Sequence, residues 1–132
     1  MTRRYSPSPL SLTRRSARAV AIGTVPLGGA HPVRVQSMLT SDTRETDDCV
    51  KETMDLVAAG CEIVRVTAQT RQIAANLEHI VAGIRAQGSD VPIVADIHFK
   101  PDAAMEAVKW VEKVRVNPGN YADKKKFQVR EY

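Results

Sequence analysis

The sequence predicts an α/β fold in which repeated strand–helix units build one parallel sheet. Apolar, β-branched runs recur near residues 33–38, 62–67, 92–97 and 113–117. Amphipathic helical patterns separate these runs, and such alternation is typical of parallel sheets. The chain has 132 residues, of which 43% are hydrophobic, enough for one small domain with a core. We therefore expect one sheet with helices packed on one side.

A β-hairpin is predicted ahead of the first strand–helix unit. The β-like runs 19–25 and 32–38 are joined across Gly28 and Gly29, which can supply the positive φ values of a hairpin turn. Before the hairpin, residues 1–12 are rich in arginine, serine and proline, and we expect them to form a flexible tail. Residues 13–132 are assigned to the folded domain.

Three helices are predicted from apolar spacing and from start and stop signals. Thr46 is the expected N-cap of the first helix, and Gly60 ends it. Gly88 ends the second helix, and Pro101 opens the third at its favoured first turn. The expected apolar faces are Val50, Met54, Val57 and Ala58 in the first helix, Ile73, Leu77, Ile80, Val81 and Ile84 in the second, and Ala104, Met105 and Val108 in the third.

The order of these units favours a barrel over an open sheet. A doubly wound sheet places a glycine-rich phosphate loop after a strand, and neither a GxGxxG nor a Walker sequence is present. A (β/α)8 barrel needs roughly 250 residues. This chain provides about four strands before a loop predicted at residues 118–120. We predict the N-terminal half of a TIM-type barrel preceded by a β-hairpin.

Polar side chains recur two residues apart in three of the predicted strands, and side chains at that spacing share one face. Arg65 and Arg115, expected on adjacent strands, could form a fork-like clamp for a phosphate or carboxylate. Asp96 and His98 could orient each other or a substrate hydroxyl, or transfer a proton. The alternative is a buried structural ion network of Arg65, Asp96 and Arg115. The three polar pairs are Arg65 with Thr67, Asp96 with His98, and Arg115 with Asn117.

Composition excludes several other classes of function. The net charge of +4 is mild, and no basic stretch carries the interleaved aromatic residues of a single-strand nucleic-acid binder. No apolar run approaches the roughly 20 residues that cross a bilayer. The two cysteines, Cys49 and Cys61, have neither metal-ligand nor disulfide-framework spacing. We expect two buried, reduced thiols in a cytoplasmic protein that binds neither nucleic acid nor membrane.

Four ordered blocks of the sequence resemble a known enzyme family. They read GTVPLGGAHPVRVQSM (23–38), EIVRVT (62–67), VPIVADIHF (91–99) and KVRVNPGN (113–120). Together they resemble the 4-hydroxy-3-methylbut-2-enyl diphosphate synthases of the methylerythritol phosphate route to isoprenoids. The likeness is specific and runs from about residue 14 to about residue 123.

The resemblance implies a barrel that binds 2-C-methyl-D-erythritol 2,4-cyclodiphosphate and opens its ring reductively. It implies a flavodoxin or ferredoxin as the electron donor. It also implies a dimer and a [4Fe–4S] cluster held by three cysteines and a glutamate in a separate C-terminal domain. By position, Arg65, His98, Arg115 and Asn117 match the residues that bind the diphosphate, and Asp96 matches their acidic partner.

The sequence also departs from this family, because the later strands and the cluster cysteines are missing. We therefore expect an N-terminal piece of the enzyme that holds no cluster and does not turn over alone. Two other interpretations stay open. One is a dihydropteroate-synthase-like barrel, which also binds a diphosphate substrate, and the other is a non-catalytic interaction module.

Overall fold

The central sheet has four parallel strands, β3 (Gln36–Met38), β4 (Ile63–Thr67), β5 (Ile93–Ile97) and β6 (Lys113–Val116). Their order in the sheet, β3-β4-β5-β6, is also their order in the chain. A doubly wound sheet reverses direction at a switch point, whereas a barrel adds each strand beside the preceding one. The strand order is therefore that of successive units of a (β/α)8 barrel, as predicted.

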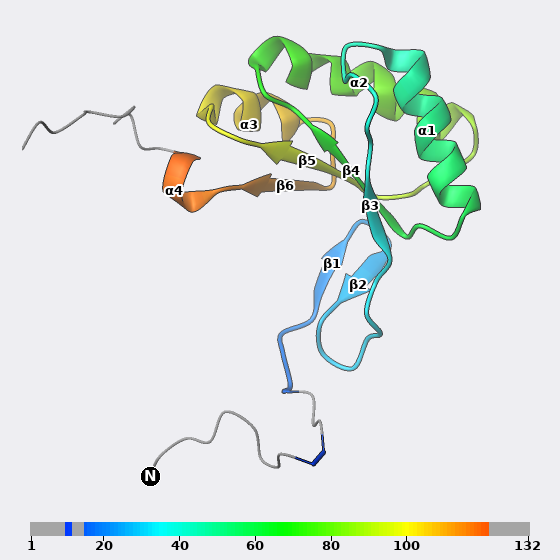
Figure 1. Ribbon diagram of the computed structural model, residues 1–132, viewed down its shortest axis with the longest axis vertical. Helices are drawn as coiled ribbons and strands as arrows, with labels where there is room; N and C mark the ends of the chain where they lie inside the picture. The colour runs from blue at the N-terminus through cyan, green and yellow to red at the C-terminus, as the bar shows by residue number, and fades with distance from the viewer. Residues whose placement is uncertain (1–9, 12–14, 122–132) are drawn as a thin grey trace, which may run out of the picture.

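A computed structural model describes residues 10–11 and 15–121 of the chain (Figure 1). Most of the predicted tail at residues 1–12 lies outside the described residues, as does the part of the predicted domain from residue 122 onward. Among the described residues, no helix is long and apolar enough to cross a membrane.

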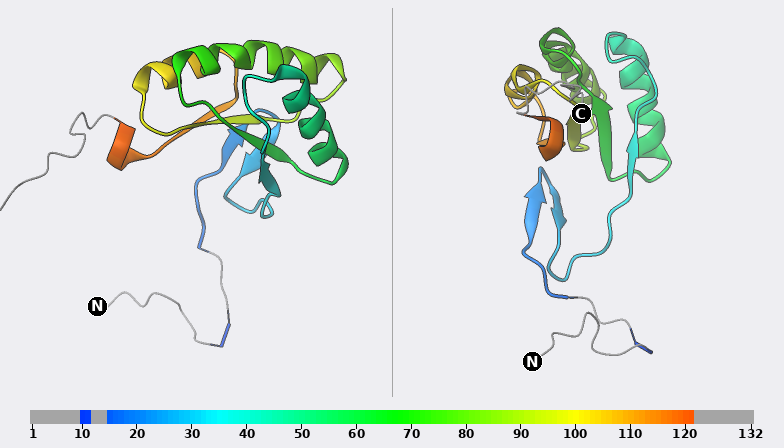
Figure 2. Two further views of the ribbon diagram at one scale, coloured as in Figure 1. Left: turned by 45° about the horizontal axis from the view of Figure 1, so that its top comes forward. Right: turned by 60° about the vertical axis from the view of Figure 1, so that its left-hand side comes forward.

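Three helices cover one face of the sheet: α1 (Thr46–Ala58), α2 (Arg71–Ala86) and α3 (Pro101–Ala107). Figure 1 and the left panel of Figure 2 show them on the side of the sheet opposite the hairpin. The one-sided packing of the helices is confirmed. A fourth, single-turn helix, α4 (Pro118–Tyr121), follows β6 where we expected a loop, so that prediction was wrong.

The hairpin exists, but its turn lies elsewhere than predicted. Strands β1 (Val20–Ile22) and β2 (Val25–Leu27) pair antiparallel around a two-residue turn that begins at Gly23, with φ +56°. Gly28 instead lies in the loop from β2 toward β3. A Cβ atom there would lie 2.3 Å from the carbonyl oxygen of Arg18, and its φ is +78°. Gly23 and the Gly28–Gly29 pair both suit a turn locally, but only Gly23 lies between two strands that pair in register.

Alternation along the strands divides the apolar side chains between two clusters. Val64, Val66, Ala95 and Ile97 are buried against the helices in the main cluster. On the opposite face, at the amino ends of the strands, a smaller cluster combines Ile22 of the hairpin with Ile63 and Val94. The predicted division of the strand faces is confirmed. The hairpin covers the inner face at the amino ends of the strands.

Two details of the helices differ from the predictions. Helix α1 begins at Thr46 itself, after Glu45, and no side chain caps its first turn. In α3 the buried residues are Ala103, Ala104 and Ala107, while Met105 and Val108 are 65% and 58% exposed. The small alanines let α3 approach its neighbours closely, so the larger apolar residues face outward.

Glutamates at the amino ends of two strands stabilise the lower edge of the sheet. Glu62 accepts hydrogen bonds from the Val35 backbone N–H at 2.8 Å and from Arg34 at 3.0 Å. Glu112 likewise accepts from the Ile93 N–H at 2.8 Å. Each glutamate directly precedes one strand, and it accepts a hydrogen bond from a backbone N–H at or just before the start of the neighbouring strand. These hydrogen bonds fix the amino ends of the strands, whereas loops follow the carboxyl ends.

Candidate functional site

Asp96 is the centre of a polar cluster on the inner face of the sheet. Its side chain is only 3% exposed. Oδ2 accepts a hydrogen bond from Arg65 Nη2 at 2.5 Å, and Oδ1 accepts one from Arg115 Nη1 at 3.1 Å. The predicted adjacency of the two arginine strands was wrong, because β5 lies between β4 and β6. That intervening strand supplies the carboxylate that joins the two guanidinium groups, here called the arginine pair.

Strand register explains how the three side chains meet. Thr67, Asp96 and Arg115 are paired across β4, β5 and β6 and form one row. Arg65 lies two residues before Thr67, so it starts one row lower on the same face. Its long side chain extends up to the carboxylate of Asp96, whereas Arg115 meets that carboxylate within its own row.

The cluster carries a net positive charge. Burial raises the pKa of Asp96, but hydrogen bonds and positive charge from Arg65 and Arg115 outweigh it, so the pKa lies below its ordinary value. One carboxylate against two guanidinium groups leaves one positive charge. Arg65 and Arg115 are 24% and 42% exposed, and Arg65 Nε is buried without a hydrogen-bond partner. Some guanidinium N–H donors therefore remain available to a ligand, because Asp96 does not accept from all of them.

The other two predicted site residues lie at the carboxyl ends of the same strands. His98 Nε2 is 3.5 Å from Asp96 Oδ2, and the side chain is 34% exposed. Asn117 follows β6, and its Oδ1 accepts the backbone N–H of Gly119 at 3.1 Å, within the first turn of α4. The structure thus brings Arg65, Asp96, His98 and Arg115 together, whereas the carboxamide oxygen of Asn117 caps a helix.

A cavity beside this cluster was not predicted from the sequence. It has a volume of about 370 Å³ and lies between the loop after β3 and the loop after β4. Residues 41–43 lie in the turn between β3 and α1. The density of hydroxyl-bearing residues in that turn was the available signal. The lining consists of Thr40, Ser41, Asp42, Thr43, Arg44, Thr67, Gln69 and Ile73.

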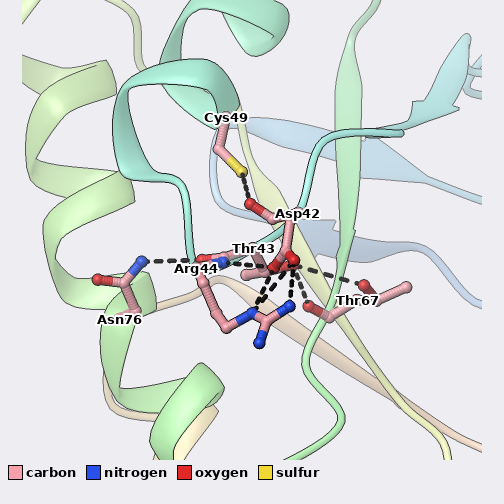
Figure 3. A network of polar contacts seen from close by, with 6 residues as sticks. All are labelled: Asp42, Thr43, Arg44, Cys49, Thr67 and Asn76. Atoms are coloured by element: carbon pink, nitrogen blue, oxygen red, sulfur yellow. Dashed lines mark hydrogen bonds and ion pairs between the residues drawn. The ribbon is translucent and has the colours of Figure 1, made fainter.

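Residues 40–44, here called the 40–44 loop, are held by contacts to β4 and α2 (Figure 3). The hydroxyl of Thr43 donates to the carbonyl oxygen of Thr67 at 2.7 Å, and Asn76 Nδ2 donates to the carbonyl oxygen of Thr43 at 2.8 Å. Arg44 forms a bidentate ion pair with Asp42. The hydrogen bonds from Arg44 lower the pKa of Asp42 to about 2, so the exposed pair stays ionised and internally neutral.

Glu52 of α1 holds the beginning of the same loop. Its carboxylate accepts the backbone N–H groups of Thr40 and Ser41, each at 2.9 Å, and their hydroxyls at 2.8 Å and 2.6 Å. Burial raises the pKa of Glu52, but these hydrogen bonds outweigh it and lower the pKa to about 2. Glu52 is therefore an ionised acceptor throughout the neutral range.

The two thiols do not fit an iron–sulfur cluster. Cys49 Sγ donates to the carbonyl oxygen of Asp42 at 3.3 Å, and burial raises the pKa of this thiol to about 11. Cys61 Sγ donates to the carbonyl oxygen of Ile63 at 3.0 Å. Cluster ligands are thiolates, and both cysteines are buried. Among residues 10–11 and 15–121, no three His, Cys, Asp or Glu side chains group so as to hold a metal ion.

Comparisons with known proteins agree with the barrel architecture. Residues 17–130 match the GcpE TIM-barrel domain. The chain is 66% identical over 128 residues to a 4-hydroxy-3-methylbut-2-en-1-yl diphosphate synthase (flavodoxin) of Akkermansia muciniphila, covering 97% of this chain and 22% of that protein. Proteins of the same name from Leptospira interrogans and Chlorobaculum tepidum are 52% and 48% identical over 132 and 127 residues. These alignments cover 100% and 96% of this chain but 20% and 17% of those relatives.

Proposed function

Because the chain belongs to the GcpE TIM-barrel domain family, we propose that it provides the diphosphate-binding part of a 4-hydroxy-3-methylbut-2-en-1-yl diphosphate synthase. The carboxylate that Asp96 shares between two arginines carries this proposal. Enzymes with this barrel bind substrates at the carboxyl ends of the strands. The guanidinium groups of the arginine pair meet Asp96 near that end of β5. The chain spans about a fifth of the length of its curated relatives, so the activity is proposed for the whole protein.

The proposed substrate is 2-C-methyl-D-erythritol 2,4-cyclodiphosphate, and the proposed reaction is its reductive ring opening. Breaking a C–O bond at a phosphate leaves additional negative charge on that phosphate oxygen. Arg65 and Arg115 would stabilise this charge through charge-assisted hydrogen bonds more strongly in the transition state than in the substrate. Asp96 would hold both guanidinium groups in place, and His98 and the amide of Asn117 would bind the remaining oxygens.

The electron donor and the cofactor belong to the same proposal. The names of the relatives specify flavodoxin, and we propose flavodoxin as the donor, with ferredoxin as the alternative. The family resemblance also implies a [4Fe–4S] cluster and a dimer. Cys49 and Cys61 do not fit cluster ligation, so we give them no part in electron transfer. Buried, free thiols suit a reducing compartment, which supports a cytoplasmic location.

The two alternative functions make different predictions. The family match over residues 17–130 favours the synthase over a dihydropteroate-synthase-like barrel. A non-catalytic interaction module would fold but bind no diphosphate. Diphosphate binding therefore separates the proposal from the module.

The decisive experiment measures binding of the cyclic diphosphate without an electron donor, so that no turnover occurs. Residues 15–121 replace the matched segment of the Akkermansia muciniphila relative, which is 66% identical to the chain. Calorimetry should show that this chimera binds the substrate. Arg65→Ala or Arg115→Ala removes charge-assisted hydrogen bonds of about 1.5–3 kcal/mol, so affinity should fall roughly ten- to hundredfold. Lysine at either position should restore only part of it.

Arg85→Ala is the matched control. Arg85 forms an ion pair with Glu112 at 2.5 Å at the opposite end of the sheet. Its loss should leave substrate affinity unchanged. The proposal is wrong if the chimera melts cooperatively but binds no substrate. It is also wrong if the alanine variants at 65 and 115 lose thermal stability while binding as tightly as the parent, because a structural ion network would behave in that way.

A further inference from the structure

The cavity beside the arginine pair differs from it in chemical character. Its lining offers hydroxyls, one carboxamide and an ion pair between Asp42 and Arg44 whose charges cancel. Glu52, hydrogen-bonded beneath the loop, adds negative charge. A phosphate would gain little in such a place. Neutral hydroxyl groups, which both donate and accept hydrogen bonds, suit this lining.

The cavity and the arginine pair share a boundary at Thr67. Thr67 lines the cavity, and it is paired in register with Asp96 in the next strand. Thr67 also lies on the same strand face as Arg65. One ligand with a charged end and a hydroxyl-bearing end can therefore occupy both places.

The shape of the cavity depends on the 40–44 loop, and that loop depends on Glu52. The Glu52 carboxylate accepts both backbone N–H groups at the start of the loop. It also fixes the Thr40 and Ser41 hydroxyls. In the described part of the chain, no other side chain of α1 forms a hydrogen bond with Thr40 or Ser41. Without this acceptor, two backbone donors and two hydroxyls would lose their common partner.

We propose that Glu52 is a positioning residue for substrate binding: it holds the 40–44 loop so that the cavity receives the hydroxyl-bearing part of the substrate whose diphosphate the arginine pair binds. This inference rests on the proposed function and adds to it. Glu52 itself contacts the loop rather than the substrate. Thr67 and Gln69, which line the cavity together with the loop, contact the substrate hydroxyls.

Two ligands separate this role from a general structural one. Inorganic pyrophosphate provides a diphosphate group without the hydroxyl-bearing carbon skeleton of the substrate. In the chimera, Glu52→Gln turns an amide N–H₂ toward backbone donors and should release the loop. Affinity for the cyclic diphosphate should fall about two- to tenfold, as expected for lost hydrogen bonds between neutral groups. Affinity for pyrophosphate should not change.

Glu62→Gln is the matched control, because Glu62 also accepts a backbone N–H, at 2.8 Å, but at the opposite end of the sheet. It should lower the melting temperature without changing either affinity. Should Glu52→Gln fail to fold, Ser41→Ala and Gln69→Ala provide the test. Ser41→Ala removes one hydroxyl bond to Glu52, and Gln69 is exposed. Both should weaken binding of the cyclic diphosphate alone.

Equal binding of the cyclic diphosphate by the parent and these variants would overturn the inference, as would a parallel loss of pyrophosphate binding. Arg115→Ala distinguishes this failure from failure of the proposed function, because it should weaken both ligands. If Arg115→Ala has that effect and the Glu52 and Gln69 variants do not, only the role of the cavity is wrong. If no variant affects either ligand, the proposed function itself fails.

Discussion

At the scale of single residues, the cluster is organised by one buried acid. Asp96 is the only buried charged side chain among the described residues, and burial of an unpaired carboxylate would be strongly unfavourable. Its two arginine partners differ in exposure, and Arg115 is the more accessible. Arg65 is therefore more firmly fixed by Asp96, while Arg115 is freer to move toward a ligand.

Asp96→Asn should destabilise the chain in a pH-dependent manner. Losing one partner of a buried pair costs about 3–5 kcal/mol, and partial exposure of the arginines reduces this to about 2–3 kcal/mol at pH 7. The folded-state pKa of Asp96 is lowered. Its stabilisation is thus present above the ordinary carboxyl pKa and is lost as the pH falls through the folded-state value. Urea unfolding should show the difference between parent and variant shrinking in acid.

Asp42→Asn serves as the comparison for that measurement. Asp42 also has an arginine partner and a lowered pKa, but its ion pair is exposed to solvent. Exposed pairs contribute little to stability, so this variant should unfold nearly as the parent does. An equal loss for both variants would contradict the special role given to Asp96.

At the scale of elements, α1 and α2 pack so closely that a glycine is required between them. A Cβ atom on Gly83 of α2 would lie 2.7 Å from Val50 Cγ2 of α1. Val50 is buried and its branched side chain has little rotameric freedom. Helix propensity alone would favour alanine over glycine by about 1 kcal/mol. Here the packing of two helices opposes that local preference.

Gly83→Ala should therefore destabilise the chain, by about 1–3 kcal/mol, although alanine is the better helix former. The clash disappears when the partner is truncated, so Val50→Ala should be less harmful in the Gly83→Ala background than alone. A double-mutant cycle by chemical denaturation measures this coupling. Additive effects of the two substitutions, or stabilisation by Gly83→Ala, would show that the helices are not in tight contact here.

The strands and their inner face could be predicted from the sequence because alternation along a strand is set by backbone geometry. Arg65, Asp96 and Arg115 were placed on one face for this reason. The predicted barrel order already implies that β5 lies between β4 and β6. The expectation of adjacent arginine strands was inconsistent with that order, and Asp96 of β5 lies between the two arginines. The hairpin turn was misplaced because Gly23 and the Gly28–Gly29 pair both suit a turn, and local chemistry does not distinguish them.

The cavity could not be predicted, because its organising contacts are not local. Glu52 lies eleven and twelve residues after the loop that it holds, and no helical or strand period links those positions. The same applies to Asn76, which bonds to Thr43 from another helix. Such contacts depend on how α1 and α2 return across the sheet. A sequence pattern indicates each helix or strand, but it does not indicate which side chains of different elements come into contact.

At the scale of the whole molecule, the sheet has two unpaired edges among the described residues, β3 and β6. Unpaired edges present free backbone donors and acceptors and favour pairing with other chains. The side chains of Gln36 and Met38 on β3 are also exposed. We infer that the inner face of this sheet is incompletely covered by the described residues.

The purified 132-residue chain should therefore self-associate as its concentration rises. Light scattering after size exclusion should report an average mass that increases with loading. The chimera, in which the remaining part of the relative is present, should keep a constant mass under the same conditions. A chain that stays monomeric at every concentration would indicate that the edges are protected.

The agreement between strand order and chain order has a consequence for biosynthesis. Contacts between elements mainly join neighbours, such as β4 with β5 and α1 with α2. Each strand–helix unit can thus dock as soon as it leaves the ribosome, because its partner edge was synthesised just before it. Little of the chain has to wait for distant residues, which favours fast folding and N-terminal elements that form first during translation. Nascent segments of increasing length should gain protection from hydrogen exchange one unit at a time.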